Sequence, residues 1–135
     1  MDTSVSHGFH AAFEPTPVKV AEMRRATAAL LQKACLPESL ASDVVLAVSE
    51  LVTNAIVHGD GEVGLHVSVN RERVRVSVSD QSPDEAFLMW AEADCESGRG
   101  MNLVAELAAA WGVEVTPTGK KVWAELRPPA ERRAA

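Results

Sequence analysis

The chain has 135 residues, 47% of them hydrophobic, and a formal net charge of −6, which suits one domain with a single packed core. The negative charge argues against a nucleic-acid partner, because phosphate binding needs a basic face. The sequence contains no run of about 18 consecutive apolar residues, so we expect no membrane span. The first ten residues, MDTSVSHGFH, lack the basic and apolar regions of a signal peptide. The two cysteines belong to no CxxC motif, so we expect a cytoplasmic protein with reduced thiols.

The first part of the chain predicts one strand and one helix. Residues 8–14, GFHAAFE, are interpreted as a short edge strand that ends before a proline. Thr16 is a candidate N-cap for a helix over residues 17–35, whose first position is a proline. This helix is locally basic, and Arg24 lies among its charged residues. The basic side is either a solvated face or a docking patch for an acidic protein partner.

The longest amphipathic stretch is DVVLAVSELVTNAIVHG, residues 43–59, in a helix that opens near residues 37–39. Its polar residues Glu50, Asn54 and His58 have the spacing i, i+4, i+8, so they line up along one stripe. A carboxylate and an amide oxygen one turn apart can share a hard cation or its waters. The alternative is a stripe that faces water.

The middle of the chain predicts a β-hairpin followed by a long connection. Valines and one leucine alternate with other residues over 63–69 and again over 74–80, which predicts two antiparallel strands, the second ending at Asp80. Residues 81–97 have neither helix nor strand periodicity. A connection of this length is uncommon in a small domain unless it is functional, so we interpret it as a lid.

A glycine-rich turn then opens the last predicted helix, residues 101–111. Backbone N–H groups at such a helix start can bind an anion, and here Gly98 and Gly100 flank the positive charge of Arg99. The alternative is a plain loop-to-helix turn. Two closing strands are predicted over 112–116 and 121–126.

The order of these elements predicts the fold class. Strands and helices do not alternate as in βαβ units, so a doubly wound parallel sheet is not expected. We predict an α+β fold, a two-layer α/β sandwich in which helices cover one face of a mostly antiparallel sheet. One domain over residues 1–127 and a flexible tail over 128–135 follow from the same pattern.

The polar residues of these elements form one chemically coherent set. Asn54 can hold Mg²⁺, which takes few protein ligands and keeps several waters. Asp80 can accept a hydrogen bond from the exocyclic amine of a base, and the turn around Arg99 can hold phosphates. Glu50 can take the proton from an attacking hydroxyl or water. We therefore hypothesise a Mg-nucleotide site.

The motifs resemble those of a known superfamily. ELVTNAIVHG resembles the N-box of the GHKL ATPases and kinases, which include gyrase, histidine kinases and MutL, and SGRGMNLV resembles their second glycine box. The closest likeness is to the single-domain anti-sigma-factor serine kinases of the SpoIIAB and RsbW type, over residues 9–127. Stand-alone ATP-binding regulators of actinobacteria are also similar.

The resemblance implies a role for each matching residue. It implies that Glu50 is the general base and that Asn54 is the Mg²⁺ ligand. It also implies that Asp80 recognises adenine and that Arg24 contacts a protein partner. The ATP-binding residues that it implies within the three motifs are Asn54, His58, Asp80, Gly98, Arg99, Gly100 and Met101.

The function implied is that of an ATP-dependent serine/threonine protein kinase and anti-sigma factor, with ATP and Mg²⁺ as cofactors. Its partners would be a sigma factor and an anti-anti-sigma protein of the STAS type, and a homodimer is possible. The first glycine box is altered, because Gln81-Ser82-Pro83 follows Asp80 where glycines are usual. The second hypothesis is therefore a catalytically inactive protein-binding module with weak or no nucleotide binding. A detached ATP-binding half of a histidine kinase is a third.

Overall fold

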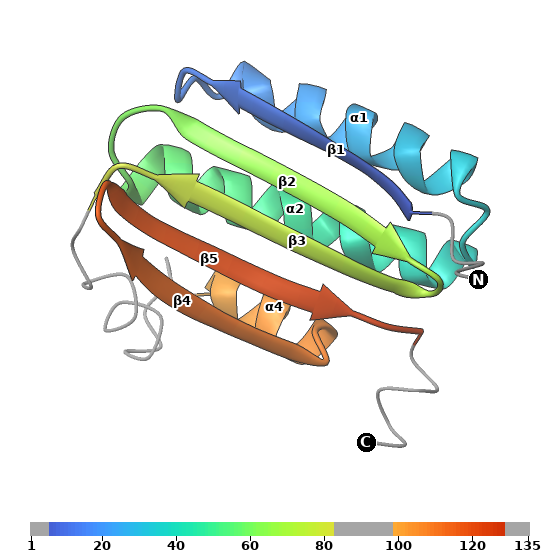
Figure 1. The fold of residues 1–135 in the computed structure, drawn as a ribbon. Helices are drawn as coiled ribbons and strands as arrows, with labels where there is room; N and C mark the ends of the chain where they lie inside the picture. The colour runs from blue at the N-terminus through green and yellow to red at the C-terminus, as the bar shows by residue number, and fades with distance from the viewer. Residues whose placement is uncertain (1–5, 83–98, 129–135) are drawn as a thin grey trace.

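The computed structural model describes residues 6–82 and 99–128. It contains a five-stranded sheet of order β1-β2-β3-β5-β4 in which every neighbouring pair is antiparallel, and Figure 1 shows this arrangement. The elements are β1 (Ser6–Phe13), α1 (Val18–Lys33), α2 (Glu38–His58), β2 (Val63–Asn70), β3 (Arg73–Asp80), α4 (Arg99–Leu107), β4 (Ala110–Thr116) and β5 (Gly119–Leu126). The predicted α+β class and the edge position of the first strand are confirmed.

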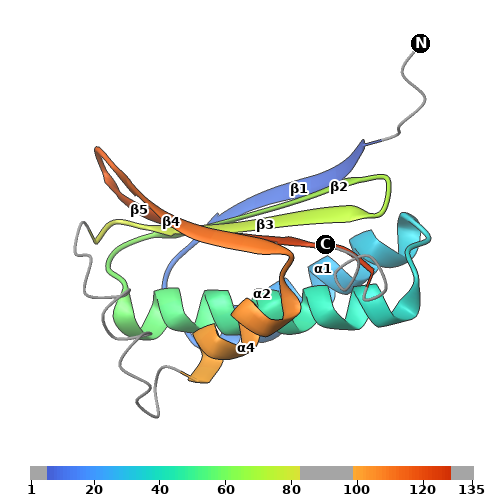
Figure 2. The same ribbon diagram turned by 90° about the horizontal axis from the view of Figure 1, so that it is seen from below.

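The helices form a second layer on one face of the sheet. Figure 2 shows α1, α2 and α4 together on that face, as the sequence predicted. α2 packs against both other helices and against β2, β3 and β5, so it is the central element of the core. By length and composition α2 would pass for a membrane-spanning helix, with a mean hydropathy of 1.6, but half of that window is buried in the protein.

The core lies between α2 and the alternating apolar residues of the strands. One face of each inner strand is buried and the other is more open, which is the period-two pattern of a half-buried sheet. The fully or nearly fully buried residues of α2 and of the inner strands are Leu40, Val44, Ala47, Val48, Leu51, Val52, Val63, Leu65, Val67, Val69, Val74, Val76, Val78, Ala124 and Leu126. This core holds the carboxyl end of α2 against the ends of β3 and β5.

Two predicted boundaries were wrong. The N-cap of α1 is Pro17 and makes no side-chain cap bond, so Thr16 lies one residue too early; its carbonyl instead accepts a hydrogen bond from the Lys19 N–H at 3.0 Å. The last helix does not reach residue 111, because Ala110 and Trp111 pair with β5 as part of β4. Strand pairing there prevails over the helix propensity of an alanine run.

Part of the predicted chain organisation lies outside the described residues. The predicted lid, residues 81–97, is described only at Gln81 and Ser82, and the predicted tail, 128–135, only at Pro128.

Candidate functional site

Three segments that are far apart in the sequence meet around the end of β3. A Cβ atom at Gly59, the residue after α2, would lie 2.6 Å from the Asp80 carboxylate, so a glycine is needed for this approach. A Cβ at Gly119, the first residue of β5, would overlap the Asp80 backbone. The Gln81 N–H also donates a hydrogen bond to the Asp60 carbonyl at 2.7 Å. The end of α2, the end of β3 and the start of β5 therefore form one tightly packed junction.

Asp80 is the charged group at this junction, and it is buried, with 7% of its surface exposed. Its Oδ1 accepts a hydrogen bond from the Ser82 N–H at 2.8 Å. Lys120 lies directly opposite Asp80 in the β3–β5 ladder, and its Nζ is 2.9 Å from Oδ2 and 3.1 Å from Oδ1. Only 4% of the Lys120 surface is exposed, so the two residues form a buried ion pair.

Sequence reasoning identified Asp80 and missed its partner. The sequence patterns assign no role to Lys120 and place the start of the last strand at residue 121. A signal was present, since Lys120 has the same parity in β5 as Val122, Ala124 and Leu126, which all lie in the core. A lysine at a core-facing position is almost never buried without a partner.

Asn54 lies on α2, one turn before its last residue, and is buried, with 8% of its surface exposed. Within the described parts of the chain, its Nδ2 has no hydrogen-bond partner. Buried polar side chains are normally paired, so an orphaned amide points to a ligand or a water that completes it. The water-facing interpretation of the stripe is wrong for Asn54.

The other two residues of the stripe differ from Asn54 in exposure. Glu50 is half-buried one turn earlier, and His58 is exposed in the last turn of α2. The middle residue of the stripe is therefore the most buried, and the stripe becomes exposed at the His58 end.

The structure describes the predicted phosphate-binding turn, residues 98–100, only from Arg99 onward. Gly98 lies outside the described residues, Arg99 and Gly100 begin α4, and Met101 follows in its first turn. α4 packs against α2, and Val104 is fully buried. The structure thus confirms that a helix starts at the Gly-Arg-Gly turn and brings this helix against α2.

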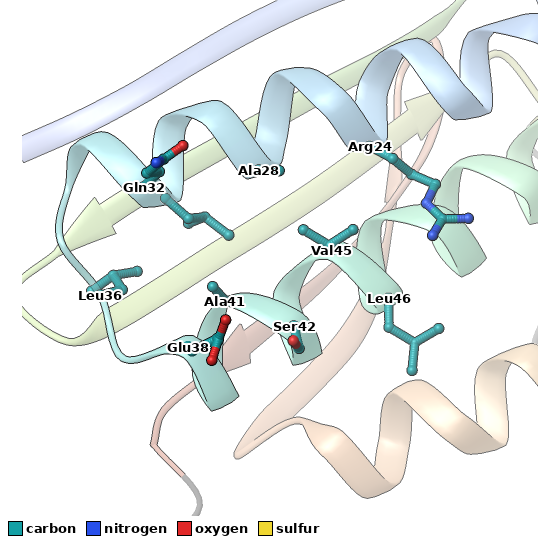
Figure 3. A pocket seen from close by; sticks show the side chains of 10 residues that line it. Arg24, Ala28, Gln32, Leu36, Glu38, Ala41, Ser42, Val45 and Leu46 are labelled. Carbon is teal, nitrogen blue, oxygen red and sulfur yellow. The ribbon is translucent and has the colours of Figure 1, made fainter.

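Arg24 lies at a different place, in a groove between α1 and α2. The groove has a volume of about 580 Å³, and its lining residues are Arg24, Ala28, Leu31, Gln32, Leu36, Glu38, Ala41, Ser42, Val45 and Leu46. Figure 3 shows Arg24 toward one end and Glu38 toward the other. The groove does not include Glu50, Asn54 or Asp80, so it is a separate surface.

The described residues fit an adenine nucleotide with Mg²⁺ at the junction in two respects. The buried Nδ2 of Asn54 lacks a partner among these residues and can donate to a phosphate oxygen or a water, while the metal would be held by the oxygen of the same amide. A carboxylate at the end of β3 is approached closely by a glycine. Asn54 is the residue that would hold the metal, and Asp80 the residue that would recognise the base. The buried ammonium of Lys120 is an additional feature of this site.

Fifteen chains of solved structures match this chain significantly, and three of them illustrate the similarity. The first is the structure of the RsbU and RsbW domains of Rv1364c from Mycobacterium tuberculosis, with a TM-score of 0.69 and 19% identity over 89% of this chain and 32% of that chain. This protein thus spans about a third of the length of that chain. The second is the SiaB–SiaC complex from Pseudomonas aeruginosa, with a TM-score of 0.65 and 15% identity over 86% of this chain and 88% of the other.

The third is the histidine kinase domain of the blue-light activated histidine kinase from Erythrobacter litoralis EL346, with a TM-score of 0.55 and 22% identity over 86% of this chain and 62% of that chain. At these identities the likenesses show the fold. Comparison with curated proteins finds no significant match. The family model for the histidine kinase-like ATPase domain matches residues 13–126. That match spans the core, the N-box helix and the final strand, and this chain therefore belongs to the histidine kinase-like ATPase domain family.

Proposed function

We propose that this protein is an ATP-dependent regulator of the anti-sigma-factor type. In this proposal it holds a sigma factor away from promoters and phosphorylates a serine or threonine on an anti-anti-sigma partner of the STAS type. Family membership supports ATP binding, and the RsbW domain and the SiaB–SiaC complex among the similar folds support partner regulation. We place this activity in the cytoplasm, and a homodimer is compatible with it.

The observation that carries the proposal is the amide nitrogen of Asn54, unpartnered among the described residues and close to the carboxyl end of α2. Gly59, the residue after this helix, packs on Asp80. A buried donor without a partner is costly, and an acceptor such as a phosphate oxygen would complete it, while Mg²⁺ would be held by the amide oxygen of the same side chain. Asn54 and Asp80 are the side chains through which the protein would bind and orient a Mg-nucleotide.

The residues have separate roles in the proposed reaction. Bound Mg-ATP supplies a transferable phosphoryl group whose charge the metal helps to neutralise. Asn54 would hold the metal through its amide oxygen, and Asp80 would accept a hydrogen bond from the base. The backbone N–H groups at the start of α4 hold phosphate oxygens, as helix N-termini do. Glu50 would take the proton from the partner's hydroxyl. It is half-buried and lies on α2 one turn before Asn54.

A phosphoryl-transfer assay tests this proposal. Wild type and Glu50→Gln are incubated with labelled Mg-ATP and a STAS-type partner, and the rate of partner labelling is measured. We expect Glu50→Gln to lower the rate by about 10²- to 10⁴-fold, the usual contribution of a general base, while nucleotide binding is kept. Unchanged transfer by Glu50→Gln would show that this residue is not the base.

Partner docking is proposed at the groove that contains Arg24. The groove has an apolar lining with Arg24 and Glu38 among its charged members, which suits a partner segment with an apolar side and an acidic residue placed to meet Arg24. The groove is separate from the proposed nucleotide site, so the two can be altered independently by mutation.

The second candidate function is a protein-binding module that does not depend on nucleotide. The buried pair of Asp80 and Lys120 favours it, because the carboxylate proposed for base recognition already has a partner. This candidate predicts that partner affinity is the same with Mg-ATP, with Mg-ADP and without nucleotide. The kinase proposal predicts a difference among the three.

A further inference from the structure

Lys120 places a buried ammonium directly on the carboxylate that is proposed to recognise the base. The antiparallel register sets Lys120 opposite Asp80, and its Nζ lies 2.9 Å from Oδ2 and 3.1 Å from Oδ1. Both side chains are nearly inaccessible, with 4% and 3% exposed. The contact is fixed by strand pairing and burial, unlike a surface ion pair that changes with rotamer and salt.

The acceptor capacity of the Asp80 carboxylate is largely used by this contact. A carboxylate offers about four lone-pair positions. The Ser82 N–H and the Lys120 ammonium both donate to Oδ1, and the ammonium nitrogen also lies 2.9 Å from Oδ2 as an ion pair. A further donor must therefore approach Oδ2 beside a full positive charge, which repels the partly positive hydrogens of an amine.

We propose that Lys120 determines nucleotide affinity and base discrimination by competing with the exocyclic amine of adenine for the Asp80 carboxylate. This inference rests on the proposed nucleotide function of the Asp80 site. Lys120 thereby weakens the hydrogen bond from the 6-amino group, so the protein binds adenine nucleotides less tightly than the rest of its site permits. It also makes the 6-amino group nearly dispensable for binding.

The first test uses the wild-type protein and two nucleotides. Purine riboside triphosphate is ATP without the 6-amino group, so the ratio of its Kd to that of ATP measures the contribution of that group. We expect a ratio below about threefold, whereas a free carboxylate would give roughly ten- to a hundredfold, the usual value of a hydrogen bond to a charged group. A ratio above about tenfold would overturn the proposal.

The second test removes the ammonium and uses its neighbour as a control. Lys120→Thr is compared with Lys121→Thr, which loses the same charge from a half-exposed residue that lies 3.8 Å from Glu114. We expect Lys120→Thr to bind ATP about tenfold more tightly and to raise the nucleotide ratio to about tenfold or more. Lys121→Thr should match the wild type.

The direction of this change is diagnostic. Loss of a positive charge weakens attraction for a triphosphate in general, so tighter binding by Lys120→Thr that is accompanied by a raised nucleotide ratio indicates release of Asp80. ATP binding by Lys120→Thr that equals or is weaker than that of Lys121→Thr would overturn the proposal. Thermal melting confirms that each variant is folded. If the threonine variant is unfolded, Lys120→Met replaces it with the same expectations, because methionine is neutral, of similar length and has no donor for Asp80.

The outcomes separate this inference from the proposed function. Nucleotide binding by the wild type without a gain in the Lys120 variant would leave the proposed function standing and refute the inference. Binding by the Lys120 variant alone would confirm the inference and refute nucleotide dependence of the natural protein. Absence of binding in both would refute both.

Discussion

Replacement of Asn54 by alanine is expected to stabilise the protein in the absence of nucleotide. Asn54 is buried and its Nδ2 has no partner within the described residues. A buried donor that lacks a hydrogen bond costs about 1–3 kcal/mol, and alanine removes this cost. Alanine is also a better helix former than asparagine by roughly 0.5 kcal/mol, and Asn54 lies within α2.

These two contributions have the same sign, and a smaller loss of packing opposes them. We therefore expect Asn54→Ala to raise the free energy of unfolding by about 1–2 kcal/mol. For a chain of this size that corresponds to a Tm increase of roughly 3 to 8 °C. Urea unfolding followed by circular dichroism, without nucleotide and with unchanged m-value, measures the difference.

A buried hydroxyl that is paired provides the control. Thr27 is fully buried, and its Oγ1 donates a hydrogen bond to the Met23 carbonyl at 2.7 Å. Thr27→Val removes that bond with little change of shape, so it should lower the free energy of unfolding by about 1 kcal/mol. An Asn54→Ala variant that is also less stable than the wild type would show that its amide has a structural partner, and the reasoning from the orphaned nitrogen would fail.

Three further substitutions test the fold and the two surfaces. Gly59→Ala places a methyl 2.6 Å from the Asp80 carboxylate. It should lower the free energy of unfolding by about 1–3 kcal/mol, measured by urea unfolding, and weaken Mg-ATP binding, measured by calorimetry. Stability equal to wild type would show that the junction can relax. Leu51→Ala opens a cavity in the core beneath the sheet and should cost about 2–5 kcal/mol, with the urea midpoint as the measure. Arg24→Glu changes an exposed residue, so the free energy of unfolding should stay within about 0.5 kcal/mol of wild type. Affinity for the protein partner should fall about tenfold or more. Unchanged affinity in a pull-down titration would show that the partner does not bind in the groove.

Local sequence patterns predicted most of the fold. Alternating valines in β2 and β3 specify half-buried strands by themselves, and the long apolar face of α2 specifies the central helix. The end of the last helix was not predictable in this way. Ala110 is a good helix former, and only its pairing with Glu125 across the sheet decides that it is in a strand.

The candidate site was predicted in composition and only partly in structure. The spacing of Glu50 and Asn54 indicated a shared stripe, but the same spacing also occurs on helix faces that point to water, and burial decides between them. The contact of Asp80 with Lys120 joins residues 40 positions apart. It depends on the register of β3 with β5, which no local pattern records.

The measurement that most directly tests the central claim is calorimetric titration of wild type and Asn54→Ala with Mg-ATP and Mg-ADP. The claim is that a Mg-nucleotide binds where α2, β3 and β5 meet. It predicts that wild type binds both nucleotides and that Asn54→Ala, although more stable without ligand, loses this binding. Equal binding by the two proteins would place nucleotide away from Asn54. No binding by wild type at millimolar nucleotide would contradict the claim that the natural protein acts through ATP.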